Sequence, residues 1–302
     1  MPKRKLETPS SRTLRSASST SSPRSSSSSS PPSKPPVKRT PSKSNKKAYS
    51  TKIPADFKSL NDLVTELRAD KTAPVDSAGA EVICQQPPLV PIEVYHFQVL
   101  IALMLSSQTK DAVVSAAMAK MQTKIPGGLT VQSVSAISDA TLDEHIHSVG
   151  FHNNKVKYIK KACETIVKDY SGEIPNTSEG LCSLAGVGPK MAHLVMNVAF
   201  NEITGIGVDT HMHRIFNILK WVNSSQPDNT RQQLEAWLPR AYWGQINLIW
   251  VGFGQESQQQ KEKAIKKAIA CSRPKEALNL LKRVGVDLKK EAARYEITLP
   301  KF

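Results

Sequence analysis

The sequence predicts an all-α fold. After Pro54, apolar residues recur at helical spacing through most of the chain. The segment Val94 to Leu105 is apolar nearly all round, which is typical of a buried central helix, and it is too short to span a membrane. No convincing succession of alternating apolar and polar residues indicates strands.

The first 55 residues differ in composition from the rest of the chain. Residues 1–55 hold 13 Lys or Arg and one acidic residue, and they are rich in Ser and Pro. Such a segment cannot bury enough apolar surface to order itself, so we expect a disordered basic tail. The formal net charge of +15 lies mainly in this tail, because 28 basic and 25 acidic residues nearly balance in the remainder. The charge indicates a polyanionic partner.

The tail also carries targeting signals. Pro2-Lys3-Arg4-Lys5 is similar to a short nuclear import signal, although a merely solvated basic tail remains an alternative. An Arg- and Ser-rich, acid-poor composition also suits a mitochondrial presequence. No apolar core follows the basic residues, so no secretory signal is expected. We expect the nucleus as the first location and the mitochondrion as the second.

Several amphipathic segments are expected to be helices. Phe57, Leu60, Leu63, Val64 and Leu67 fall on one helical face. Asn223 to Asn229 is expected to be a polar loop, and Lys261 to Lys290 a basic helical run with a helix start at Pro274. The other helices are expected at Ala112 to Met121, Leu142 to Val149, Val156 to Val167, His211 to about Val222, and from Leu234 to Phe253.

A glycine-containing turn between two helices is the most informative stretch. Thr177 to Ser183 is expected to be a short helix, Gly186-Val187-Gly188 a hairpin turn, and Pro189 to Phe200 a second helix. Proline suits the first helical position because its missing amide would have no partner there. Glycines let the backbone approach a ligand closely, and unpaired amides at a helix start attract anions. The pattern predicts a phosphate-binding turn.

Two ionisable residues follow this turn. Lys190 would lie at the positive end of the helix dipole, where the field disfavours an ammonium and so favours a nucleophilic amine. Asp209 precedes another amphipathic segment and is placed as an ionised helix N-cap. Each feature alone is also compatible with an ordinary helix–helix turn, a surface lysine or a simple cap.

Taken together, these motifs resemble those of the endonuclease III family of helix-hairpin-helix DNA glycosylases. That family has the run Leu-Pro-Gly-Val-Gly-x-Lys-Thr-Ala followed by Val-Asp-Thr-His. Leu184 to Ala192 is similar to the run, with Ala185, Pro189 and Met191 as variants, and Val208 to His211 matches throughout. The resemblance implies Lys190 as the nucleophile and Asp209 as the essential carboxylate. It also implies DNA contacts at Gly186, Val187, Gly188 and His211.

Two further segments resemble DNA-inserting loops of the family. Leu105 to Asp111 is similar to a Leu-Ser-x-Gln-x-x-Asp segment, in which the resemblance implies that Gln108 enters the gap left by an extruded nucleotide. Gly150 to Lys155 is similar to a Gly-hydrophobe-x-x-x-Lys loop, in which Phe151 would wedge into the duplex and Lys155 would contact DNA. Extruding a base costs a few kcal/mol of stacking, so the space needs filling. A polar helix start and a core phenylalanine are the alternatives.

By resemblance, the fold has two helical lobes with the DNA groove between them. One lobe would be residues 91–204 with the helix-hairpin-helix motif, and the other would combine residues 56–90 with 205–302. The resemblance covers roughly Phe57 to Gln255. The basic segment after it suggests either DNA contact or a solvated helical tail.

The cysteines do not match the family's iron–sulfur cluster. In the family, four closely spaced cysteines usually follow this point, whereas this chain has Gln255 to Gln260 and then only Cys271. Cys84, Cys163 and Cys182 lie elsewhere, and no Cys-x-x-Cys occurs. A four-cysteine cluster or a zinc site of that kind cannot be assembled, so we expect no cofactor and no metal. Cys163 and Cys182 are expected to be buried thiols.

The implied activity is excision of an oxidised pyrimidine from damaged double-stranded DNA, followed by strand cleavage through a lysine Schiff base. We expect a monomer. An oxidised-purine glycosylase shares the lysine and the aspartate, but the Val-Asp-Thr-His and Leu-Ser-x-Gln segments favour pyrimidines. A monofunctional adenine glycosylase would lack Lys190. A non-catalytic DNA-binding scaffold is the remaining alternative, although binding alone needs neither Lys190 nor Asp209.

Overall fold

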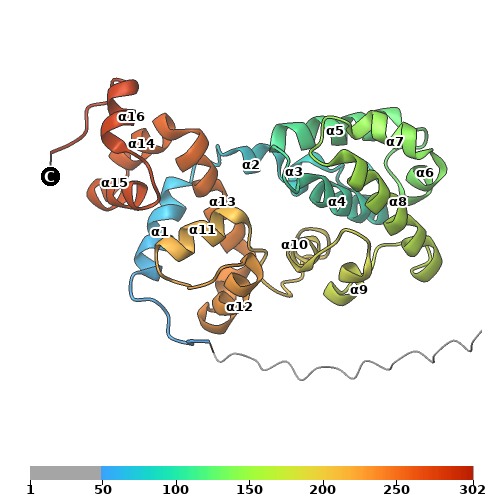
Figure 1. The fold of residues 1–302 in the computed structure, drawn as a ribbon, viewed down its shortest axis with the longest axis horizontal. Helices are drawn as coiled ribbons and strands as arrows, with labels where there is room; N and C mark the ends of the chain where they lie inside the picture. Colours follow the sequence, from blue (N-terminus) through green and yellow to red (C-terminus); the bar gives the residue numbers. More distant parts are fainter. Residues whose placement is uncertain (1–48, 302) are drawn as a thin grey trace, which may run out of the picture. The chain divides into compact units, whose positions relative to one another are not determined.

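Every regular element that the structure describes is a helix, which confirms the all-α class (Figure 1). This computed structural model describes residues 49–301. The import signal and nearly all of the expected basic tail lie outside the described residues. Residues 49–55 form no helix, but Tyr49 donates a hydrogen bond to Gln232 at 3.1 Å. None of the described helices is long and apolar enough to cross a membrane.

The first hydrophobic core lies around α4 (Ile92–Ser106). This helix is buried on nearly all sides, as its uninterrupted apolar sequence predicts. Its expected ends, Val94 and Leu105, were each within two residues of those observed. The other helices that contribute to this core are α3 (Ala80–Ile83), α5 (Asp111–Lys124), α6 (Val131–Ala136), α7 (Asp139–Ile146), α8 (His152–Asp169), α9 (Ser178–Ser183) and α10 (Pro189–Phe200).

The second core combines the first helix with the helices after residue 205. Aromatic rings pack around the fully buried Trp250, with centroid distances of 5.1 Å to Phe216, 5.0 Å to Trp221 and 5.8 Å to Phe253. Such T-shaped pairs add to the stability gained from burying the rings. The helices of this core are α1 (Phe57–Leu67), α11 (Thr210–Ile218), α12 (Pro227–Trp237), α13 (Trp243–Gln259), α14 (Lys261–Ala270), α15 (Pro274–Arg283) and α16 (Leu288–Arg294), with the 3₁₀ turn η1 (Arg240–Tyr242) before α13.

Several expected boundaries need correction. Ala80 and Cys84 belong to the first core, whereas the expected division put residues 56–90 with the second. The helix expected to reach Val222 ends at Ile218. The loop expected from Asn223 to Asn229 is shorter than predicted, because α12 begins at Pro227. The basic run Lys261 to Lys290 is divided into α14, α15 and α16, with a helix start at Pro274 as predicted. The division occurs because Pro274 and the left-handed Gly285 interrupt helical hydrogen bonding.

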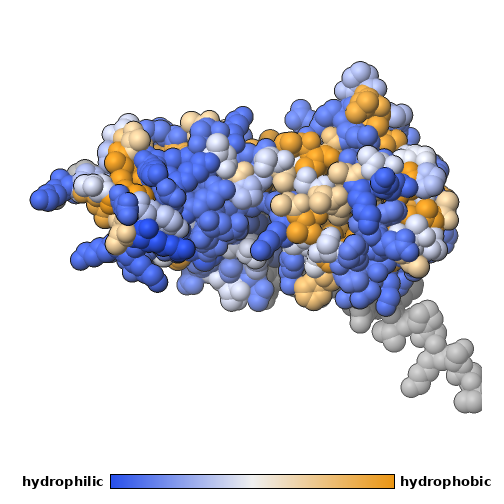
Figure 2. Space-filling model, turned by 90° about the horizontal axis from the view of Figure 1, so that it is seen from above, coloured by the Kyte–Doolittle hydropathy of each residue, from blue (hydrophilic) through white to orange (hydrophobic). Residues whose placement is uncertain are grey.

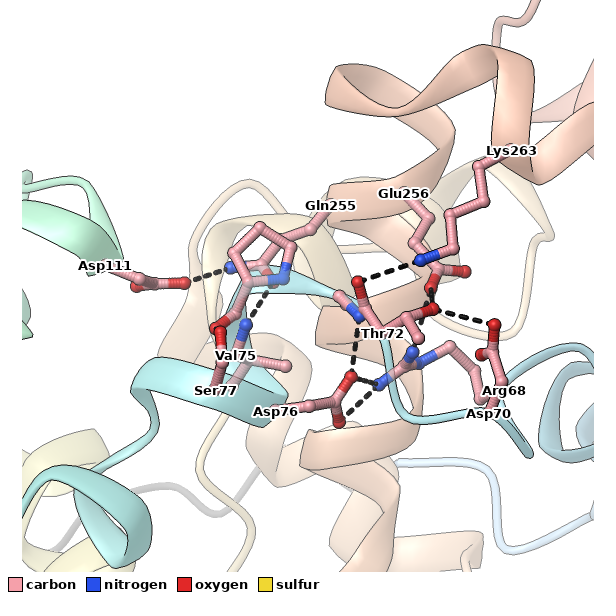
Figure 3. A network of polar contacts seen from close by, with 12 residues as sticks. Arg68, Asp70, Thr72, Val75, Asp76, Ser77, Asp111, Gln255, Glu256 and Lys263 are labelled. Carbon is pink, nitrogen blue, oxygen red and sulfur yellow. Dashed lines mark hydrogen bonds and ion pairs between the residues drawn. The ribbon is translucent and has the colours of Figure 1, made fainter.

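A buried ion-pair network ties α1, α2 (Pro74–Ala78), α13 and α14 together (Figure 3). The Arg68 guanidinium donates to both oxygens of Asp76 at 2.6 Å and to Glu256 at 3.0 Å. Lys267 of α14 donates to the same oxygen of Glu256 at 2.7 Å. The side chains of Arg68 and Glu256 are 5% and 2% exposed, so each charge depends on its partners for compensation.

The surface outside these cores is mostly polar. The face in Figure 2 is largely hydrophilic, with smaller hydrophobic groups between the hydrophilic residues. Among the large apolar side chains that remain exposed is Phe151. Scattered exposed apolar residues are ordinary, but a phenylalanine at the tip of a turn points to a binding role.

Arg68→Met should lower the free energy of unfolding by about 3 kcal/mol, because it leaves buried carboxylates without their main partner. Urea denaturation monitored by circular dichroism measures this loss. Lys58→Met is the matched control, since it breaks only the exposed pair of Lys58 with Asp62 at 3.2 Å and should cost less than about 1 kcal/mol. Equal losses in the two variants would show that the network does not hold the second core together.

Candidate active site

The hairpin between α9 and α10 has the geometry of an open anion-binding turn. Gly186 has φ +80°, and a Cβ there would lie 2.8 Å from Tyr158 of α8, so glycine is required. Gly188 precedes Pro189, the first residue of α10, and nothing lies within 4 Å of the place where its Cβ would be. No side chain caps the start of α10. The amides of its first turn are therefore available to a ligand.

The expected site residues of the hairpin take different places in this turn. Val187 is buried in the first core and can offer a ligand only its backbone. Its side chain, together with Leu184, anchors the turn to that core. Lys190 is the second residue of α10 and is exposed. Its amine forms no ion pair or hydrogen bond with the residues in the described range, so it is accessible to a substrate.

Asp209 caps α11 as the sequence predicted. Its Oδ1 accepts a hydrogen bond from the Met212 amide at 2.8 Å, while the backbone at Asp209 is extended. Within the described residues, the cap uses only one of the two carboxylate oxygens, Oδ1.

Four charged side chains lie within electrostatic range of His211. Burial lowers the pKa of His211 below its ordinary value, so the imidazole is neutral at physiological pH. Asp209 and Asp111 act in the opposite direction, whereas Arg214 and Lys190 add to the lowering. Lys190 of α10 and Asp209 of α11 are therefore both within electrostatic reach of one imidazole. A Cβ at Gly254 of α13 would lie 2.6 Å from Cβ of His211, so this glycine makes room for it.

The linker between α10 and α11 fixes these two helices to each other. Residues 205–208 are all buried. A Cβ at Gly205 would lie 2.5 Å from the ring of His193, and one at Gly207 would lie 2.7 Å from Leu194, both in α10. Sequence reasoning missed this role, although the Gly-x-Gly spacing directly before Val208 was a usable signal. The glycines let the chain press against α10 immediately before the carboxylate.

The two loops expected to enter DNA lie next to each other. Gln108 and Phe151 have φ +51° and +58°, and both are exposed. The Gly150 amide donates to the Thr109 hydroxyl at 3.1 Å, which joins the two turns. Phe151 is 61% exposed rather than part of the core. An apolar side chain at such a tip can enter a base stack.

Lys155 differs from its expected role. It is only 5% exposed, and its amine donates to the carbonyls of Leu105 and Ser107 at 2.7 Å and to Thr109 at 3.0 Å. All three donors of the ammonium are therefore used inside the protein. A direct DNA contact, as expected from the sequence, would require breaking these bonds.

The cysteines of the described chain do not fit an iron–sulfur cluster. Cys84 and Cys163 are buried in the first core, and burial raises the pKa of each thiol to about 12, so both stay protonated. Cys271 follows α14 and donates to the carbonyl of Ala268 at 3.2 Å. Cys182 is exposed on α9, which corrects the expectation of a buried thiol there, because it lies on the outer face of a short helix. Across residues 49–301, no group of three His, Cys, Asp or Glu is arranged to hold a metal ion.

Comparisons with known proteins identify the family of this chain. A model of the HhH-GPD superfamily of base excision DNA repair proteins matches residues 101–240. Endonuclease III-like protein 1 of Gallus gallus is 48% identical over 206 residues, covering 68% of this chain and 72% of that protein. The endonuclease III homolog of Schizosaccharomyces pombe is 40% identical over 209 residues, covering 69% of this chain and 58% of that protein.

Solved structures of endonuclease III with DNA have the same fold. A trapped covalent intermediate with DNA has a TM-score of 0.55 and 26% identity, covering 66% of this chain and 84% of that one. A non-covalent DNA complex has a TM-score of 0.60 and 24% identity, covering 79% and 97%. The resemblance drawn from the hairpin and the Val-Asp-Thr-His segment is confirmed: this chain belongs to the endonuclease III family of helix-hairpin-helix base excision DNA repair proteins.

Proposed function

We propose that this protein excises oxidised pyrimidines from double-stranded DNA and cleaves the strand at the resulting abasic site. The observation that carries the proposal is that the exposed Lys190 and the capping carboxylate Asp209 both lie within electrostatic range of the half-buried His211. A nucleophilic amine beside an ionised carboxylate suits a reaction that develops positive charge on a sugar.

In the proposed reaction, the neutral amine of Lys190 attacks C1′ of an extruded nucleotide. The bond from C1′ to the base breaks, and the base leaves with the electron pair and takes up a proton. Asp209 stabilises the positive charge that develops on the sugar in this step. The attached nitrogen loses a proton, and its lone pair then forms the C1′=N bond of a protonated Schiff base while the C1′–O4′ bond breaks and O4′ leaves with the electron pair and takes up a proton, which opens the sugar ring. Loss of a C2′ proton then breaks the C3′–O bond, and hydrolysis of the Schiff base releases the lysine.

The surrounding elements would seat the DNA for this reaction. The amides at the start of α10, reached past Gly188, would bind a backbone phosphate. Gln108 and Phe151 would fill the gap that the extruded nucleotide leaves. A neutral His211 keeps an additional positive charge away from the developing cation on the sugar. A non-catalytic scaffold would need the phosphate seat but not an unpaired lysine near the capping aspartate.

Lys190→Gln should abolish the covalent adduct that borohydride traps with duplexes containing an oxidised pyrimidine or an abasic site, a loss of roughly a thousandfold or more. Duplex binding should persist, because backbone amides make the phosphate seat. Lys157→Gln, at another exposed lysine on α8, is the control and should trap at the wild-type rate. Trapping by Lys190→Gln at that rate would mean that another amine is the nucleophile. If the wild type traps on no lesion and no abasic site, the scaffold function is favoured.

Asp209→Asn should slow base release by roughly a hundredfold, because the amide carries no charge to stabilise the sugar cation. The amide oxygen can still accept from the Met212 amide, so thermal stability should change little. Single-turnover release of base, measured beside the melting temperature, separates the two effects. A large loss of stability with a proportionate loss of activity would assign Asp209 to capping alone.

Gly186→Ala and Gly188→Ala should affect different properties. Gly186→Ala should lower stability by about 1–3 kcal/mol, because it forces a side chain into a left-handed conformation against Tyr158. Gly188→Ala has open space around it and should leave stability within about 0.5 kcal/mol. It should nevertheless weaken duplex binding by about 1 kcal/mol, roughly fivefold, if a phosphate approaches this point. Unchanged duplex affinity in Gly188→Ala would place the phosphate elsewhere.

We further propose that the protein works without the family's iron–sulfur cluster. The supporting observation is that the segment after α13 folds into α14 and offers a cluster only Cys271. Protein purified anaerobically should contain far less than stoichiometric iron and sulfide, and it should lack the visible absorption, near ~400 nm, of iron–sulfur proteins. Four equivalents of each per chain would overturn this proposal and leave the glycosylase proposal intact.

A further inference from the structure

The turn after α4 and the turn before α8 form one structural unit. A Cβ at Gly150 would lie 2.5 Å from the carbonyl oxygen of Gln108, so the two backbones are in direct contact. The Thr109 hydroxyl accepts from the Gly150 amide at 3.1 Å and donates to the Ser107 carbonyl at 3.2 Å. The two exposed residues of the unit, Gln108 and Phe151, therefore cannot move independently of each other.

Lys155 is the internal brace of this unit. It lies in the first turn of α8, one helical turn after Phe151, and reaches back to the end of α4. The carbonyls of Leu105 and Ser107, which accept from its amine, are among those that a helix end leaves without intrahelical partners. The third bond goes to Thr109. A single buried ammonium thus caps α4 and fixes both turns.

The ammonium of Lys155 has no acidic hydrogen-bond partner among the described residues. Burial alone lowers the pKa of Lys155 to about 8. The charged groups on the elements packed against it are engaged elsewhere or point away: Asp143 of α7 pairs with His152 of α8, and Asp111 of α5 accepts from Gln255. Lys110, at the start of α5, is exposed. As the pH rises through 8, the ammonium of Lys155 loses a proton and keeps only two N–H donors. One of the three oxygens that accept from it then loses its hydrogen bond.

We infer that Lys155 is a positioning residue that holds Gln108 and Phe151 as one insertion unit and thereby sets how efficiently a nucleotide leaves the duplex. The inference rests on the proposed function of these two loops. Lys155 touches neither the substrate nor the reacting atoms. Replacing Lys155 should therefore impair extrusion of the nucleotide from the duplex and leave the chemical step at Lys190 unchanged.

The test compares two substrates that differ in their need for extrusion. An abasic site in duplex DNA requires the loops, whereas the same site in a single strand does not. Lys155→Met should lower the rate of borohydride trapping on the duplex by roughly tenfold, about 1.4 kcal/mol, and change the single-strand rate by less than about twofold. Thr109→Val, which removes one of the three acceptors, should lower the duplex rate by about threefold. Lys157→Met, at an exposed position on the same helix, is the control and should change neither rate.

The pH dependence gives an independent reading. The ratio of duplex to single-strand rates removes the pH dependence of the chemical step that both substrates share, because both use the same nucleophile. In the wild type this ratio should be constant below pH 8 and fall above it, since the ammonium is lost as the pH rises through that value. In Lys155→Met the ratio should be low at all pH values. A ratio that falls above pH 8 in both proteins would overturn the inference.

A second readout separates this inference from the proposed chemistry. Fluorescence of 2-aminopurine beside a lesion reports unstacking in duplexes bound to protein, whether or not an adduct forms. Lys155→Met and Thr109→Val should reduce the fluorescence gain at saturating protein, and Lys157→Met should not. Equal gains in all variants, or equal losses of rate on both substrates, would show that Lys155 only stabilises the fold. If the wild type traps neither substrate, the proposed chemistry fails, and the fluorescence still decides the role of Lys155.

Discussion

The candidate site depends on three consecutive residues of α13, Gly254, Gln255 and Glu256. Each of them contacts a different part of the molecule. The first leaves room for His211 on the helix that Asp209 caps. The second donates to Asp111 at the start of α5, at 2.7 Å, and so links α13 to the first core. The third compensates the buried charge of Arg68. A shift of α13 would disturb all three at once, and the buried charge makes such a shift costly.

The same network also attaches α14 to the second core. Lys267 of α14 donates to Glu256 of α13, and apolar side chains of α14 such as Ile265 pack into the second core. Buried aromatic rings around Trp250 add further apolar contact to this core. Such packing needs no ligand geometry, so the sequence after α13 is free to form ordinary amphipathic helices.

Local signals predicted much of the fold and of the site. Pro189 marks the start of α10 through its fixed φ and missing amide, and Asp209 marks the start of α11 through its side-chain oxygen, so both helix starts were predicted from the sequence alone. The role of Lys155 was not predictable, because its three acceptors lie 46 to 50 residues earlier in the chain. Ala80 was assigned to the wrong core for a different reason. Its helix α3 is too short to show a buried face by periodicity.

Lys190 and Asp209, the proposed catalytic residues, belong to elements of two different cores that are joined by a linker whose residues 205–208 are buried. α10 packs into the first core, and α11 packs into the second. Residues 201–209 lead from α10 to α11, and within this segment Gly205 and Gly207 press against α10. Asn197 of α10 also donates to the carbonyl of Gly244 in α13 at 3.2 Å. The separation of Lys190 from Asp209 is therefore set by how the cores are joined as well as by the pair itself. Substitutions at the junction can change the chemistry without touching either residue, because small displacements of reacting groups have large effects on rate.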